Sequence, residues 1–139
     1  MKKKIVVGIR LLLGMLFLVF GLNKFFWFLP MPAPAPEAGA FFGALMATGY
    51  FMKLLPTVEV ISGVLLLSNF FVPLALTLLA PIIVNILFFH LFMDLSGLPL
   101  ALVITAMEIF LAYSYRNHFK TVLVQKAELT ESLTMEGVK

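Results

Sequence analysis

The chain has no cysteine. Disulfides, thiolate nucleophiles and thiolate metal sites are therefore excluded for the chain acting alone. Histidine is also scarce, because His90 and His118 are the only two and neither lies in a spacing typical of metal ligands. We expect no metal site. Any redox role has to use a bound cofactor or a partner protein.

Charged residues are few as well. They make up 12% of the sequence, against about a quarter of a soluble globular chain, whereas 62% of the residues are hydrophobic and 15 are Phe. This composition predicts an integral membrane protein. The basic residues lie at positions 2–4 and in the C-terminal tail rather than on a folded basic face interleaved with aromatics. They are typical of topology signals, and nucleic acid is not an expected partner.

Four apolar segments approach the length of about 20 helical residues that crosses a hydrocarbon core of about 30 Å. They are residues 5–28, 51–70, 72–92 and 98–115. Short connections between the last three predict antiparallel neighbours. The expected fold is all-α, an antiparallel four-helix transmembrane bundle over residues 1–115, followed by a polar cytoplasmic tail over residues 116–139.

A fifth apolar segment, residues 38–50, is too short to span the membrane. It follows the Pro-rich stretch LPMPAPAPE, which stops the first span. We expect a short extracytoplasmic helix, interfacial or re-entrant, that either seals the bundle or covers a site as a lid. Both ends of the chain carry basic residues, whereas the opposite connections offer only Lys53. This asymmetry predicts a multi-pass protein of a bacterial-type inner membrane with both termini in the cytoplasm.

One stripe of the first span repeats at steps of four and three residues: Arg10, Gly14, Phe17, Gly21 and Lys24. Residues at these steps share a helical face, and glycines there let another helix approach closely. The two cations should therefore face protein. The fourth span carries Glu108 on its own small, polar stripe at a depth similar to that of Arg10. We expect a buried Arg10–Glu108 ion pair. The alternative is that Arg10 extends to the surface and Glu108 is neutral.

Lys24, Glu59 and His90 lie at similar depths near the outer ends of three different spans. We therefore expect them to converge on a ligand-binding pocket beneath residues 38–50, because ligand sites are mostly apolar with a few convergent polar groups. The expected aromatic wall consists of Phe25, Phe41, Phe42, Phe88 and Phe89. The alternative is an ion-paired staple between helices. The Asp94 carboxylate should orient the His90 ring, and Asn85 should tie its helix to a neighbour.

The chain resembles the DoxX-like family of small four-span membrane proteins over residues 5–115. The features that carry the resemblance are R-x3-G-x2-F-x3-G-x2-K in the first span, the ATGY segment before the second span and E-x3-G-x-L-L-L within the second span. The resemblance implies an accessory or small subunit of a respiratory or redox system, such as a subunit of a thiosulfate:quinone oxidoreductase. It assigns no catalytic residue here, and the lack of cysteine departs from thiol-based chemistry.

Three functions are compatible with these features. The first is a non-enzymatic accessory subunit that binds a partner or a small apolar ligand, with the lipid bilayer, a second copy or a redox subunit as partners. The second is a quinone-linked oxidoreductase subunit, in which Lys24 or His90 would hydrogen-bond a quinone carbonyl and Glu59 would relay its proton. The third is a small-molecule transporter, which four helices without an inverted repeat support least. A quinone or a lipid is the expected bound molecule, and no catalytic residue is assigned.

Overall fold

The computed structural model describes residues 2–126, which form helices and no strand. The helices in chain order are α1 (Lys2–Phe26), α2 (Pro36–Ala47), α3 (Phe51–Ser68), α4 (Val72–Phe92), the 3-10 helix η1 (Leu95–Gly97), α5 (Leu98–Ser114) and α6 (Arg116–Phe119). The predicted all-α fold class, an antiparallel four-helix bundle with one short extra helix, is confirmed. Residues 127–139 of the predicted tail lie outside the described residues.

Within the described part of the chain, four helical segments are long and apolar enough to cross a membrane. They are Lys2–Phe26, Phe51–Ser68, Val72–Phe92 and Leu95–Ser114. The first helix begins at Lys2, before the predicted start at Ile5, because a helix can continue past the hydrocarbon into water. Large apolar side chains remain exposed along the spans, for example Phe92 at 83% and Ile109 at 65%. Such surfaces suit contact with lipid.

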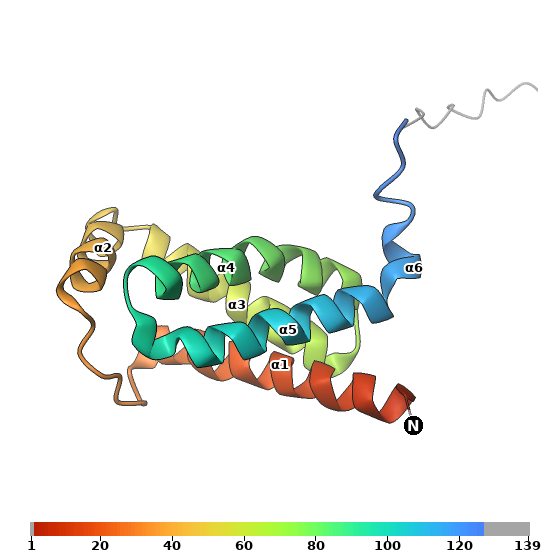
Figure 1. Ribbon diagram of the computed structural model, residues 1–139, viewed down its shortest axis with the longest axis horizontal. Coiled ribbons are helices and arrows are strands. Elements are labelled where there is room, and N and C mark those ends of the chain that lie inside the picture. The colour runs from red at the N-terminus through yellow and green to blue at the C-terminus, as the bar shows by residue number, and fades with distance from the viewer. Residues whose placement is uncertain (1, 127–139) are drawn as a thin grey trace, which may run out of the picture.

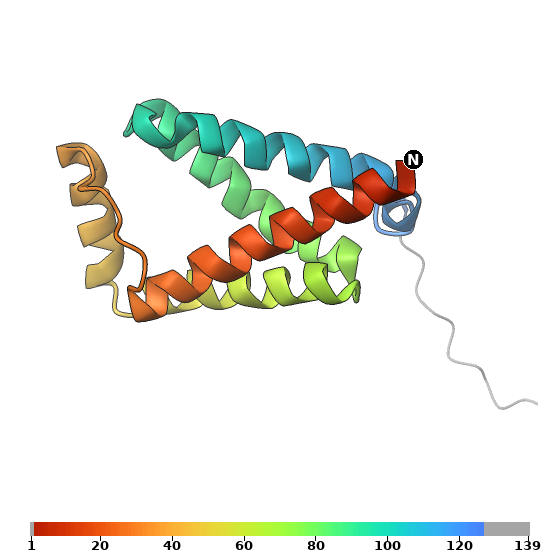
Figure 2. The ribbon, with the colours of Figure 1, turned by 90° about the horizontal axis from the view of Figure 1, so that it is seen from below.

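The four long helices run side by side, with α2 at one end and the start of α1 at the other, beside α6 (Figure 1). We call these the α2 end and the termini end. Helix α1 packs against α3 and α5. It lies with α3 at the α2 end and approaches α5 at the termini end (Figure 2). The core therefore changes its helix neighbours from one end of the bundle to the other.

Glycines set the closest helix contact, between α1 and α3. A Cβ atom added at Gly63 would lie 2.7 Å from the Leu18 amide nitrogen and 2.8 Å from the Gly14 carbonyl oxygen. A Cβ atom added at Gly21 would lie 2.9 Å from a Val60 methyl carbon. These positions leave no room for a side chain, so the two backbones come close only because of the glycines. The prediction that the glycine stripe of the first span faces another helix is confirmed.

The connection from α1 to α2 is fixed by Asn23. Its side-chain oxygen accepts a hydrogen bond from the Leu29 amide at 2.7 Å, and its side-chain nitrogen donates to the Leu29 carbonyl at 3.5 Å. Trp27 turns the chain with a φ of 53°. The Pro-rich stretch then leads to Pro36, which starts α2, a favoured position for a residue without an amide hydrogen.

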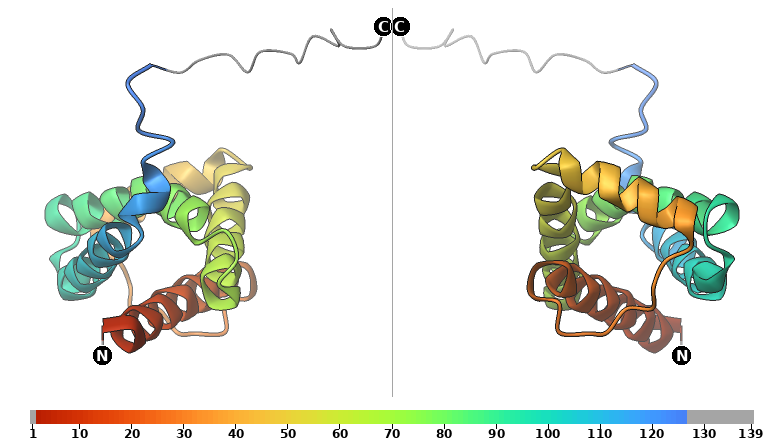
Figure 3. Two further views of the ribbon diagram at one scale, coloured as in Figure 1. Left: turned by 90° about the vertical axis from the view of Figure 1, so that its right-hand side faces the viewer. Right: turned by 90° about the vertical axis from the view of Figure 1, so that its left-hand side faces the viewer.

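Helix α2 lies across the ends of α3 and α4 (Figure 3). Two aromatic contacts hold it to α4: the ring centroids of Phe41 and Phe42 lie 5.8 and 5.0 Å from that of Phe89. Such pairs add to the stabilisation that burial gives. Helix α2 therefore covers this end of the bundle without crossing the membrane.

Candidate functional site

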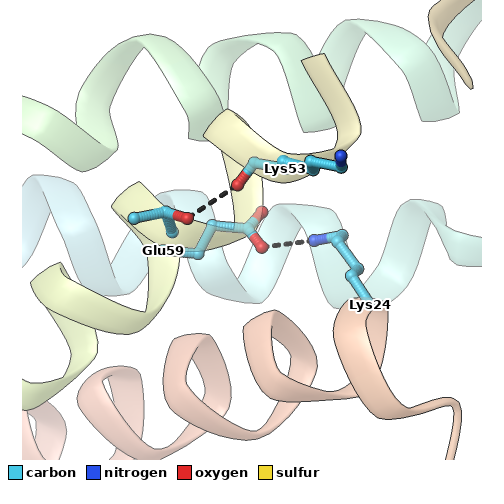
Figure 4. Close-up of polar contacts among 4 residues, drawn as sticks. Lys24, Lys53 and Glu59 are labelled. Carbon is cyan, nitrogen blue, oxygen red and sulfur yellow. Dashed lines mark hydrogen bonds and ion pairs between the residues drawn. The ribbon is translucent and has the colours of Figure 1, made fainter. Parts of the chain in front are cut away.

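Lys24 and Glu59 form an ion pair between α1 and α3 (Figure 4). The Glu59 side chain is 2% exposed and that of Lys24 is 28% exposed. Gly21, one turn before Lys24, lets α1 lie directly against the Glu59 residue. Because a buried carboxylate without a partner is costly, this pair stabilises the packing of α1 on α3. It has the geometry of the ion-paired staple.

His90 is held at the other side of the α2 end, by the turn that follows α4. Its Nδ1 atom lies 2.8 Å from the carbonyl oxygen of Asp94, to which an Nδ1–H would donate. A Cβ atom at Gly97 would overlap the imidazole ring, so only glycine fits there. The prediction that the Asp94 carboxylate orients the ring is wrong, because the backbone carbonyl of that residue does so.

The Asp94 carboxylate is instead bound by Ser96. It accepts hydrogen bonds from the Ser96 hydroxyl at 2.6 Å and from the Ser96 amide at 3.0 Å, which cap η1. These bonds favour the ionised carboxylate and lower the pKa of Asp94 below its ordinary value of 3.8. The turn between α4 and α5 is thus stabilised by the Asp94 carboxylate, which shares no hydrogen bond with the His90 ring within residues 2–126.

The three residues predicted to bind a ligand make two separate sets of polar contacts. Lys24 bonds Glu59, and the described residues show no hydrogen bond or ion pair between either of them and His90. Their joint role in ligand binding stays a prediction. No group of three or more His, Asp or Glu residues in residues 2–126 could hold a metal ion.

Two adjoining cavities lie beneath α2, with volumes of ≈ 220 and ≈ 370 Å³. We call them together the Asn85 recess, because Asn85 and Phe41 line both. The smaller cavity is also lined by Phe88, Phe89, Phe92 and Met93, and the larger by Phe51, Leu54, Leu55, Val58, Leu78, Pro81 and Ile82. Phe41, Phe88 and Phe89 belong to the aromatic wall expected from the sequence. Lys24, Glu59 and His90 line neither cavity.

Asn85 is the polar residue whose surroundings differ from the prediction. It was expected to tie its helix to a neighbour, but it is exposed and makes no hydrogen bond within residues 2–126. The signal was present in the sequence, since Pro81 and Phe89 lie one turn away on either side and therefore share its face. That face meets the recess rather than another helix.

Arg10 and Glu108 are buried at 6% and 7% exposure, as expected. Arg10 does not extend to the surface. The described residues show no hydrogen bond or ion pair between the two side chains, and the Nε and Nη1 atoms of Arg10 and the Oε2 atom of Glu108 have no partner. The Ser62 hydroxyl, fully buried in α3, is likewise unpartnered. A direct Arg10–Glu108 pair thus stays a prediction.

A bundle of four spanning-length helices, covered at one end by a short, mostly apolar helix and carrying buried charges between its helices, defines a small multi-pass helical membrane protein. The family model described as DoxX matches residues 5–91, more than half of the chain, so the chain belongs to the DoxX family. Neither the curated proteins nor the solved structures compared with the chain gave a match.

Proposed function

We propose that the protein is a non-enzymatic membrane subunit that binds an apolar molecule with a small polar head in the Asn85 recess. One observation carries the proposal: an exposed, unpaired Asn85 amide lies between two cavities whose other walls are apolar. A polar side chain facing hydrocarbon is unfavourable unless it finds a partner. A bound molecule would provide one.

The chemistry of the recess selects the class of molecule. The Asn85 amide both donates and accepts hydrogen bonds, so it suits a carbonyl or a hydroxyl group. The phenylalanine and leucine walls suit a hydrocarbon chain or an aromatic ring. A membrane lipid and an isoprenoid quinone both combine a small polar head with an apolar body. Either can enter from the bilayer, because the recess opens at the surface of α4, where Asn85 and Phe88 are exposed.

In this proposal the helices around the recess are held in position by Lys24, Glu59 and His90. Glu59 faces α1, whereas Leu55 and Val58 of the same helix face the recess. The Lys24–Glu59 pair would therefore fix the rotation of α3, and the His90–Asp94 bond would fix the end of α4. The three residues predicted as ligands would act on the site through helix position.

The test is purification in mild detergent followed by extraction and mass spectrometry of retained lipids and quinones. Asn85→Leu should lower the retained amount about five- to tenfold, since one hydrogen bond contributes about 1 kcal/mol or slightly more. Thr77→Val is the matched control. Thr77 is exposed on the same helix, but its hydroxyl donates to the Pro73 carbonyl at 2.8 Å and lies outside the recess. Thr77→Val should retain as much ligand as the wild type.

Equal retention by Asn85→Leu and the wild type would exclude the recess as the binding site. Phe41→Ala provides a second probe, since Phe41 lines both cavities and loses its ring contact with Phe89. If a quinone is retained and a respiratory or redox partner subunit reduces it, the result would favour the quinone-linked oxidoreductase subunit. A retained phospholipid would favour the accessory subunit.

A further inference from the structure

The unpartnered charges of the core lie away from the Asn85 recess. Arg10 is on α1 and Glu108 is on α5, the two helices that approach each other toward the termini end (Figure 2). Neither residue lines the recess. The side chains next to them on their own helices, Leu13 and Leu111, are fully buried in one apolar cluster.

Both side chains need partners that the described residues do not give. Two nitrogens of Arg10 and one oxygen of Glu108 are buried without a hydrogen bond. An arginine keeps its charge in proteins, so Arg10 cannot become neutral to reduce the cost of burial. An unpaired buried charge costs several kcal/mol, more than a single-domain protein can tolerate at several positions. Most side chains of the surrounding cluster are apolar, and within residues 2–126 neither the Ser62 nor the Tyr115 hydroxyl is hydrogen-bonded to Arg10 or Glu108.

We propose that Arg10 and Glu108 bind internal water, which bridges the guanidinium of α1 to the carboxylate of α5. A water molecule can accept a hydrogen bond from Arg10 Nη1 and donate one to Glu108 Oε2, and the same or a second water can accept from Arg10 Nε, so that all three orphaned atoms gain a partner. Buried waters typically make about three hydrogen bonds to otherwise unsatisfied polar groups. A small anion fits less well, because the carboxylate beside it would repel it.

Helix α1 is then joined to its neighbours by charged side chains at two positions along its length. Lys24 bonds Glu59 directly and joins α1 to α3. Arg10, through water, joins α1 to α5. The two sites lie at different ends of one helix, so the hydrated site can be removed without touching the ion pair.

The test uses the wild-type protein in nanodiscs and X-ray radiolysis in ¹⁸O-labelled water. Radiolysis generates hydroxyl radicals from bound water, so it labels side chains next to internal water even when they are buried. Leu13 and Leu111 lie one turn from Arg10 and Glu108, and Leu79 is an equally buried leucine of α4. We expect at least threefold more ¹⁸O on Leu13 and Leu111 than on Leu79. Labelling of all three at the level of Leu79 would overturn the proposal.

Two double variants distinguish water that is bound by the charges from water that enters because the core is loosely packed. Arg10→Leu/Glu108→Leu removes both charges and should lower the labelling of Leu13 and Leu111 to the level of Leu79. Lys24→Met/Glu59→Leu removes the other charge pair and should leave their labelling unchanged. Persistent labelling in the first double variant would also contradict the proposal, because the water would then not depend on Arg10 and Glu108.

Discussion

Three polar side chains of α1 decide how this helix is held. Asn23 closes its end on Leu29, Lys24 bonds Glu59 of α3, and Arg10 is buried toward the core. Each is placed where hydrocarbon would otherwise surround it, and each faces protein instead. Asn23 and Lys24 have protein partners within residues 2–126, whereas two nitrogens of Arg10 do not.

At the residue scale, we expect Lys24→Met to destabilise the protein because it leaves the buried Glu59 carboxylate uncompensated. Complete burial would cost about 3 to 5 kcal/mol, and the partial exposure of Lys24 reduces this to about 1 to 3 kcal/mol. Unfolding in a detergent titration measures the loss. Lys24→Met/Glu59→Leu should recover most of it, and a double-mutant cycle with additive effects would show that the pair contributes no coupling.

At the element scale, the contact between α1 and α3 depends on the absence of side chains. Gly63 lies against the backbone of Leu18 and Gly14, and Gly21 lies against Val60. Helices α4 and α5 contain no glycine, and they contribute larger side chains such as Leu79 and Met107 to the same buried cluster. The α1–α3 pair is therefore the most tightly specified interface of the bundle.

We expect Gly63→Ala to lower the free energy of unfolding by about 1 to 3 kcal/mol, because a new methyl group overpacks a filled contact. The added Cβ atom would lie 2.7 Å from a backbone nitrogen that cannot move independently of its helix. Gly43→Ala is the matched control, since no atom lies within 4 Å of the added Cβ atom in α2. That change should be neutral or stabilise by up to about 1 kcal/mol. Equal effects of the two substitutions would contradict the close contact.

At the scale of the whole molecule, the start of α1 and the end of α5 share one end of the bundle, and α2 covers the other (Figure 1). Lys2, Lys3, Lys4, Arg116 and Lys120 lie at the termini end. We propose that this end faces the cytoplasm of a bacterial-type inner membrane, because short basic segments next to spans are retained on that side.

We expect C-terminal fusions to a cytoplasm-active fluorescent protein to fluoresce, whereas fusions to a periplasm-active phosphatase at the same site should be inactive. A reporter inserted between Pro32 and Pro34 should give the opposite pattern. Replacing Lys2, Lys3 and Lys4 by Gln should weaken the preference, since the remaining asymmetry is smaller. Phosphatase activity from the C-terminal fusion would reverse the proposed orientation.

Local sequence properties determined the class of the molecule. Apolar length decides where helices cross a membrane, and the period of the α-helix decides which residues share a face. The four spans, the short fifth helix and the inward face of Gly14 and Gly21 followed from these two rules. Each depends on residues a few positions apart, so no knowledge of the partner helix was needed.

Only the tertiary structure decided which faces meet. Helix rotation and tilt place Glu59 against Lys24, direct His90 to the Asp94 carbonyl and leave Asn85 at an open recess. Lys24 meets Glu59, but within residues 2–126 neither of them shares a hydrogen bond or ion pair with His90. Similar depth does not predict which of the three side chains meet, because depth fixes position along the membrane normal and leaves the lateral direction free. That direction depends on packing between helices far apart in the sequence. One arrangement is selected by the glycine contacts between α1 and α3 and by the aromatic contact between α2 and α4.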